Sequence, residues 1–181
     1  MGKKSIGKHL EPYSIYKKRR TTINHAFASA IAPSETYNEA RLDEALKLLG
    51  QDPTRDLNCV YCDAPADTWD HLVGLVKSRG PSGHGHQLHN LVPCCKSCNS
   101  KKGGKAWEDF LQDKEKRQLI KLYIERCRDS AGLRRTDKPS QEQKDIEEYY
   151  KVRDEIFRLM SKADTIAAKI RGDADPLRRE D

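Results

Sequence analysis

The chain contains six cysteines, and five of them lie within 40 residues of one another. They form one Cys-x-x-Cys pair, Cys59 and Cys62, and a second group of Cys94, Cys95 and Cys98. Two such pairs separated by a loop can supply four thiolates to a tetrahedral zinc ion, a spacing that differs from a disulfide framework. The chain begins with a basic, polar stretch that lacks the apolar segment of a secretory signal, so we expect a reducing compartment where thiols persist.

A second set of chemically capable residues lies between and after the cysteine pairs. The segments are Trp69-Asp70-His71-Leu72, then His89-Asn90-Leu91-Val92-Pro93, then Cys95-Lys96-Ser97-Cys98-Asn99. A cysteine knuckle, an Asp-His, an Asn-Leu and a Cys-x-x-Cys-Asn in this order resemble the HNH nuclease family. The resemblance runs from Cys59 to about Leu111, nearly 30% of the chain.

The resemblance implies a ββα-metal fold, in which an antiparallel hairpin is followed by a helix. By the same resemblance, His71 is the general base, and Asp70 and Asn99 hold a catalytic Mg²⁺ or Mn²⁺. Asn90 fixes the hairpin so that His71 points correctly. The zinc ligands implied are Cys59, Cys62, Cys95 and Cys98.

One alternative within the zinc site is that Cys94 replaces Cys95. Cys95 and Cys98 have the same two-residue gap as Cys59 and Cys62, and Cys95 matches the family position, so we favour Cys95 and interpret Cys94 as a packing residue at a strand end. The remaining cysteine, Cys127, stands alone, and we expect it to be a small packed hydrophobe.

These residue types suit phosphodiester hydrolysis. The anionic phosphate requires charge neutralisation and a deprotonated water, which an oxygen-liganded divalent ion and a neutral imidazole supply. Histidine alone has an unperturbed pKa, about 6.5, that leaves it neutral yet basic near neutrality. Neighbouring strand residues point to opposite faces, so Asp70 and His71 converge only if the strand ends or bends there.

The sequence predicts a mixed α+β fold that is mostly helical. Strands are expected over residues 68–73 and 88–92, with a long loop over 74–86 between them, and helices are expected over 21–32, 35–49 (with Ser34 as a possible N-cap), from about 105 onward, 114–128 and 141–171. The predicted segments are a basic arm with N-terminal helices (1–50), the nuclease core with its zinc knuckles (51–112) and a C-terminal helical extension (113–181).

The last predicted helix carries a stripe of residues in alternating steps of three and four. Arg153 alone interrupts an otherwise apolar stripe that runs from Ile146 to Ile170. Two readings follow from this stripe: the helix packs back on its own chain, or it forms a coiled coil in a homodimer.

The net charge of +6 is distributed unevenly along the chain. Residues 140–181 carry 9 Lys or Arg and 11 Asp or Glu, so residues 1–139 carry a net charge of +8. Basic surface of this kind favours nucleic acid as a partner. The candidate phosphate contacts are Lys77, Arg79, Lys101, Lys102 and Lys105.

Three histidines near the second motif admit two interpretations. His84, His86 and His89 could contact phosphate or a metal, or could be solvated side chains of a flexible loop, which we favour. The two tryptophans, Trp69 and Trp107, are expected to pack rather than to stack on bases.

The sequence thus predicts a metal-dependent endonuclease that hydrolyses DNA, of a restriction, defence or phage type. The alternatives are a non-catalytic zinc module that binds nucleic acid or protein, and an enzyme that cleaves RNA. No apolar run approaches the roughly 18 residues of a membrane span, so we expect no membrane association and a cytoplasmic protein. The resemblance to the HNH family implies a bacterial or phage-encoded protein.

Overall fold

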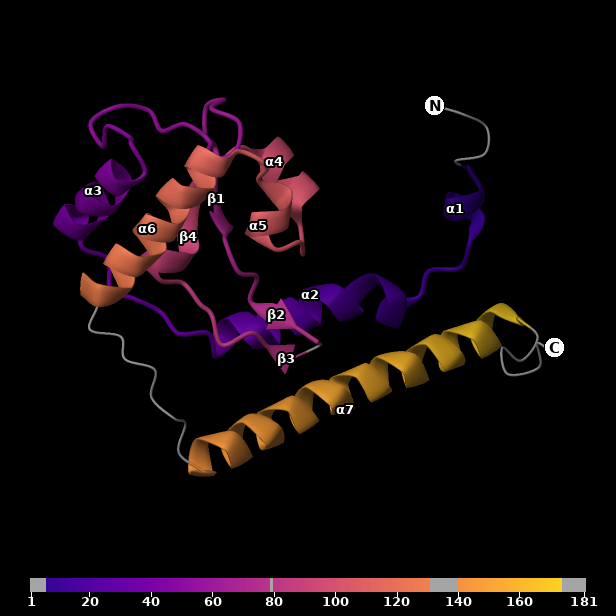
Figure 1. Cartoon of the computed structure of the whole chain (residues 1–181). Coiled ribbons are helices and arrows are strands. Elements are labelled where there is room, and N and C mark those ends of the chain that lie inside the picture. The colour runs from indigo at the N-terminus through magenta and orange to yellow at the C-terminus, as the bar shows by residue number, and fades with distance from the viewer. Residues whose placement is uncertain (1–5, 79, 131–139, 174–181) are drawn as a thin grey trace. The chain divides into compact units, whose positions relative to one another are not determined.

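The structure is a computed structural model that describes residues 6–78, 80–130 and 140–173 (Figure 1). Its contacts divide the chain into two compact units, residues 28–136 and residues 1–27 with 137–181. This division differs from the three predicted segments, because the helices on either side of the cysteines pack onto the cysteine region. The class is mixed α+β and mostly helical, as predicted.

An antiparallel pair of strands forms the centre of the larger unit. Strand β1 (Thr68–His71) pairs with β4 (Leu91–Cys94), with Thr68 opposite Cys94 and His71 opposite Leu91. Both strands are shorter than predicted. β1 ends at His71, and residues 88–90 form a 3-10 turn, η2 (Leu88–Asn90), instead of the start of the second strand.

The segment between these strands is more ordered than the predicted long loop. It contains a second, short antiparallel pair, β2 (Val76–Lys77) and β3 (Gly80–Pro81). Further along, the backbone of His86 bonds with Pro33 and Glu35, which ties the segment to the chain before helix α3 (Glu39–Leu48).

Two short helices follow β4. Helix α4 (Lys96–Lys102) begins at Cys95, whose sulfur accepts a hydrogen bond from the Cys98 amide, and ends at Gly103, whose positive φ of 50° suits glycine. Helix α5 (Trp107–Phe110) then places Trp107 in the core with 3% of its surface exposed. The helix expected from about residue 105 onward is therefore the short helix α5, separated from α4 by Gly103 and Gly104.

Helices α3 and α6 (Lys114–Ser130) pack against each other, α6 also packs against η2, and both helices contribute residues to the core of the larger unit. Asn38 caps α3 by accepting a hydrogen bond from the Arg41 amide. The expected N-cap, Ser34, lies four residues earlier and does not cap this helix. The buried core includes Leu72, Val92, Trp107, Ile120, Tyr123 and Cys127. Cys127 is thus a packed residue, as expected.

The smaller unit is built on two long helices that lie side by side (Figure 1). Helix α7 (Ser140–Arg171) has the predicted bounds within a residue, and α2 (Ile15–Ala30) starts earlier than predicted, inside the basic arm. A four-residue helix, α1 (Gly7–Leu10), precedes it. Tyr149 donates a hydrogen bond to the Phe27 carbonyl, and the two rings pack at 4.9 Å, so part of the predicted stripe packs within the chain.

Arg153, the residue that interrupts the stripe, is buried between the two helices. Its guanidinium donates to Asn24 on α2 at 2.8 Å and to Asp154 at 2.6 Å, and it lies over the rings of Tyr150 and Phe157. The arginine is therefore part of the α2–α7 contact.

Within the described part of the chain, none of the helices combines the length and apolar character that crossing a membrane requires.

Candidate metal centre and hairpin site

Four cysteine side chains converge in the larger unit. The Sγ atoms of Cys59, Cys62, Cys95 and Cys98 all lie within 4.8 Å of one another, and those of Cys62 and Cys95 are 3.8 Å apart. Tetrahedral zinc with ligands at about 2.3 Å separates its sulfurs by about 3.8 Å. The four cysteines are close enough to hold one metal ion.

Local backbone geometry brings the two cysteine pairs together. The first knuckle closes through hydrogen bonds from the Cys59 amide to Ala64 and from the Asp63 amide to Cys59, with Asp63 at a positive φ of 61°. The Val60 amide donates to the Pro93 carbonyl of β4, so the knuckle is attached to the strand that leads into Cys95.

The structure selects Cys95 over Cys94 as the fourth member of this group. Cys94 is fully buried at the end of β4, and its Sγ atom lies 3.9 Å from that of Cys59 without joining the four-sulfur group. Burial and the neighbouring sulfur of Cys59 raise the pKa of Cys94, so its thiol stays protonated. The packing role expected for Cys94 fits this position.

The sulfurs of the group differ in how readily they ionise. Burial opposes ionisation of Cys59, but hydrogen bonds from the backbone amides of Cys95, Tyr61 and Cys62 outweigh it and lower its pKa to about 7. Burial raises the pKa of Cys98, and the sulfurs of Cys62 and Cys95 raise it further. A cation bound among the four sulfurs would stabilise the negative charge of each thiolate, and so lower the raised pKa of Cys98.

Asp70 points from β1 into the core and is held there by two partners. Only 5% of its surface is exposed; the Tyr61 hydroxyl donates to its Oδ2 at 2.7 Å, and the Lys102 ammonium lies 3.1 Å from the same oxygen and 3.3 Å from Oδ1. Lys102 also donates to the His71 carbonyl at 2.8 Å. Both carboxylate oxygens are therefore engaged by residues of the chain.

His71 ends β1 and points away from Asp70, as alternation along a strand requires. It is half-buried, and its Nε2 atom lies 3.1 Å from Nδ1 of His86, whose Nε2 in turn lies 3.1 Å from the Ser29 hydroxyl. Burial lowers the pKa of His71, the neighbouring His86 lowers it further, and the negative charge of Asp70 opposes these effects. Burial and His86 together therefore favour the neutral form of the His71 imidazole.

His86 is held at this position by its own backbone. Its amide donates to the Pro33 carbonyl at 2.7 Å, and its carbonyl accepts from the Glu35 amide at 3.1 Å. A Cβ atom on the preceding Gly85 would lie 1.9 Å from the Pro33 carbonyl oxygen, so only glycine permits this approach. The interpretation of His86 as a solvated loop side chain is wrong.

The other two histidines of this segment are also at least partly buried. Burial is the largest cause of the lowered pKa of His89, which falls to about 4. Burial also lowers the pKa of His84. The Nδ1 atom of His89 is buried and has no hydrogen-bond partner among the described residues. Solvated imidazoles therefore describe neither residue.

Asn90 links the two sides of the hairpin through its side chain. Its Oδ1 accepts from the Val73 amide at 2.8 Å, and its Nδ2 donates to the carbonyls of Val73 and Gly85. With 1% of its surface exposed, it joins the chain just beyond His71 to the residue before His86. Asn90 thus connects the backbone on the two sides of the contact between His71 and His86.

Asn99 lies in α4, where its Nδ2 donates to the Trp69 carbonyl at 3.4 Å. All four predicted site residues are thus arranged on or against β1 and its extension. Among the hydrogen bonds of the described residues, none joins the side chains of Asp70, His71 and Asn99 to one another.

The candidate phosphate contacts divide into exposed and buried lysines. Lys77, Lys101 and Lys105 are exposed, whereas Lys102 is 2% exposed and paired with Asp70, which removes it from the surface. Arg79 lies outside the described residues. Trp107 is packed as expected, but Trp69 is 41% exposed.

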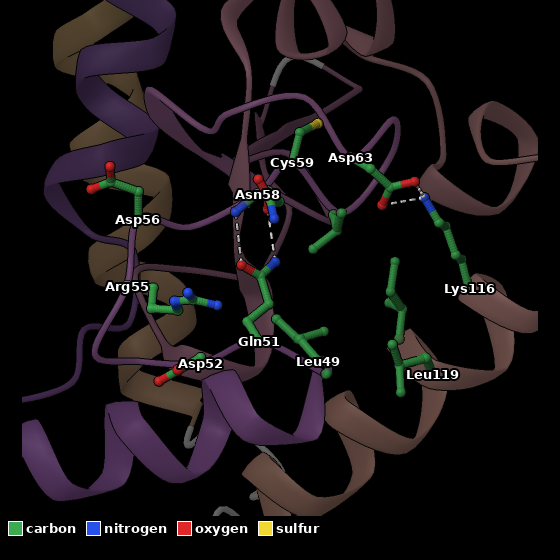
Figure 2. Close-up of a pocket in the computed structure, with 13 residues that line it drawn as sticks. Leu49, Gln51, Asp52, Arg55, Asp56, Asn58, Cys59, Asp63, Lys116 and Leu119 are labelled. Atoms are coloured by element: carbon green, nitrogen blue, oxygen red, sulfur yellow. Dashed lines mark hydrogen bonds and ion pairs between the residues drawn. The ribbon is translucent and has the colours of Figure 1, made fainter.

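A pocket lies between helix α6 and the loop that follows α3, and the first cysteine knuckle forms part of its wall (Figure 2). Gln51 bonds twice with the backbone of Asn58 there, and Lys116 pairs with Asp63 at 2.7 Å. Cys59 is the one predicted site residue that lines it, so the pocket is separate from the histidine end of the hairpin.

Comparison of this chain with protein-family models, with curated proteins and with solved structures found no match.

Proposed function

We propose that this chain is an HNH-type endonuclease that hydrolyses DNA phosphodiester bonds, with His71 as the general base. The observation that carries the proposal is the placement of His71. A half-buried imidazole with a lowered pKa ends β1, next to a segment fixed by Asn90. Such an imidazole is neutral at physiological pH and can take a proton from water.

The four-cysteine group supports the same proposal as a structural metal site that takes no part in the hydrolysis. We propose that it binds zinc, because four thiolates with this spacing suit zinc best among common metals. The bound ion would join the knuckle before β1 to the start of α4, and so hold both ends of the strand pair where the core is small.

The divalent ion expected at Asp70 and Asn99 does not fit this arrangement as it stands. Lys102 and Tyr61 engage both oxygens of Asp70, and removing the Lys102 ammonium would leave a buried carboxylate. The proposed Mg²⁺ or Mn²⁺ requirement therefore depends on Lys102 releasing Asp70. The restriction, defence or phage role and the cytoplasmic location stay predictions.

The second candidate function is a non-catalytic zinc module that binds nucleic acid. The Asp70–Lys102 ion pair favours it, because a carboxylate engaged in this way holds the strand to α4 without any metal. The exposed lysines serve either function.

Plasmid nicking in the presence of Mg²⁺ or Mn²⁺ tests the proposal. His71→Ala is expected to lower the cleavage rate by about a hundredfold to ten thousandfold, the usual contribution of a general base, while metal content and fold are retained. His25→Ala, at an exposed position on α2, is the matched control and should cleave normally. DNA binding without cleavage by the native protein would favour the second function, and a parallel RNA substrate would reveal an RNA-cleaving enzyme.

A further inference from the structure

One side of α7 carries an apolar stripe that α2 leaves exposed. Val152, Leu159, Ile166 and Ile170 have 55%, 49%, 48% and 82% of their surfaces exposed. With the half-buried residues Ile156 and Ala163, they follow strictly alternating steps of four and three. This is the spacing of a coiled-coil seam, with Ile156, Ala163 and Ile170 at a positions and Val152, Leu159 and Ile166 at d positions.

The contacts with α2 use a neighbouring face of α7. Tyr149, Arg153 and Asp164 bond with α2 or with Ser14 just before it, and Phe157 packs against Tyr16. Apart from Tyr149, these residues lie outside the a and d positions of the seam. A second helix can therefore lie along the seam without displacing α2.

The edge of the seam away from α2 has an ordered charge pattern. Glu148, Glu155, Lys162 and Lys169 occupy successive g positions, and all four are exposed. The first two are acidic and the last two are basic. Glu155 also pairs with Arg158 on its own helix at 2.5 Å, but a solvent-exposed pair of this kind contributes little and does not prevent another pairing.

A two-fold axis across the helix reverses the direction of the second copy, so that residues equally far from the axis face each other. Glu148 then faces Lys169 of the second copy, and Glu155 faces Lys162. Both pairs are centred between Arg158 and Leu159. All four residues form oppositely charged pairs, each occurring twice.

The same axis also pairs the apolar residues. Val152 faces Ala163 of the second copy and Ile156 faces Leu159, and these pairs are centred within one residue, about 1.5 Å along the helix, of the centre of the charged pairs. Further out, Ile170 faces Asp145, so the apolar contact ends before this layer.

A parallel arrangement uses these charges poorly. In a parallel pair each g residue faces the e position five residues later, which pairs Glu148 with Arg153, Glu155 with Met160 and Lys162 with Ala167. One of these three joins opposite charges, and its arginine is already bonded to Asn24 and Asp154.

We propose that α7 pairs in antiparallel orientation with α7 of a second copy of this chain. The occupant is a second copy because the charge pattern complements itself when reversed. The pairing is independent of the nuclease proposal, since it uses neither the histidines nor the cysteines.

A charge-exchange experiment on the full chain tests the pairing. Light scattering after size-exclusion chromatography should give twice the 20.7 kDa of one chain. Glu148→Lys with Glu155→Lys makes all four g positions basic, and Lys162→Glu with Lys169→Glu makes them all acidic. Each double variant should be monomeric alone, and an equimolar mixture of the two should recover the dimer mass.

Lys144→Glu with Lys151→Glu provides the matched control, because both lysines are on α7 outside the seam and its g edge. This variant should stay dimeric, and circular dichroism should show equal helix content in all the chains. A native chain that is monomeric at every concentration would overturn the proposal. So would a dimer that persists in both double variants, or two monomeric variants that fail to associate when mixed.

Discussion

The Nε2 atom of His71 lies 3.1 Å from the Nδ1 atom of His86, a residue 15 positions later in the chain. A hydrogen bond between two imidazoles requires that one donates and the other accepts, so the tautomer of His71 and the tautomer of His86 depend on each other. Ser29 extends this chain of contacts from the far nitrogen of His86. His71, His86 and Ser29 therefore form a connected series of polar contacts at the end of β1.

Replacing His86 tests its role in positioning His71. In His86→Gln we expect the cleavage rate to fall about tenfold to a hundredfold, as for other partners that orient a functional histidine. The pKa of His71 is lowered partly by the charge of His86, so its loss should raise that pKa and move the acid limb of the pH–rate profile to higher pH. The profile is measured by plasmid nicking. A lower rate with an unmoved profile would contradict the electrostatic part of this prediction.

Removing Lys102 tests the ion pair inside the core. Lys102→Met should destabilise the protein by about 3 kcal/mol, because Asp70 is left as a buried charge with one hydroxyl partner. Asp70→Asn in the same chain should recover most of this loss. Denaturant unfolding of the two single variants and the double variant gives the coupling, and additive losses would mean that the pair is not coupled.

The same variant shows whether Asp70 can hold a divalent ion. If it can, Mg²⁺ or Mn²⁺ should raise the melting temperature of Lys102→Met and leave that of the Asp70→Asn/Lys102→Met chain unchanged. The double variant is the control for ion binding elsewhere. Equal responses of the two chains would remove Asp70 from the proposed metal ligands, whatever the activity.

Replacing Cys59 and replacing Cys94 should have different effects on zinc content, although both side chains are buried and close together. Cys59→Ser should abolish zinc binding and cooperative unfolding of the larger unit, since a structural metal stabilises such small cores directly. Cys94→Ser, whose sulfur lies 3.9 Å away, should keep the metal. Elemental analysis of the purified proteins measures both. Retained zinc in the first variant, or lost zinc in the second, would contradict the assigned ligands.

His89 makes the larger unit sensitive to acid. Its pKa is lowered to about 4 in the folded protein, against about 6.5 when unfolded, so the unfolded chain binds the extra proton between these values. Stability is therefore full above about pH 6.5 and falls with pH toward 4, by up to about 3 kcal/mol. His89→Leu should reduce this fall, whereas His25→Leu should not. Urea unfolding at a series of pH values measures it, and identical slopes in the native chain and His89→Leu would contradict the prediction.

Much of the fold could be predicted from local sequence. The periodic segments gave the later helices with good bounds, and the equal Cys-x-x-Cys gaps selected Cys95 over Cys94. The start of α2 was missed because its first turn lies among basic residues with little apolar periodicity. Asn38 replaced Ser34 as a cap because α3 begins later than its apolar pattern suggests.

The partners of the site residues could not be predicted in the same way. In the sequence Lys102 is one of several basic residues near Cys98, and its burial depends on which face of α4 meets β1. Strand alternation allowed Asp70 and His71 to converge only where the strand ends or bends, and β1 does end at His71. The contact between His71 and His86 depends on Pro33 and Gly85 lying against each other, which is a feature of tertiary structure with no local pattern.

Cys95 performs two tasks with one sulfur atom: it belongs to the four-cysteine group, and it accepts the amide hydrogen of Cys98 at the first turn of α4. An oxidant that converts this thiol to a sulfenic acid would therefore act on both tasks at once. Oxidation at Cys95 would thus disturb the start of the helix whose Asn99 and Lys102 side chains donate to backbone carbonyls of β1.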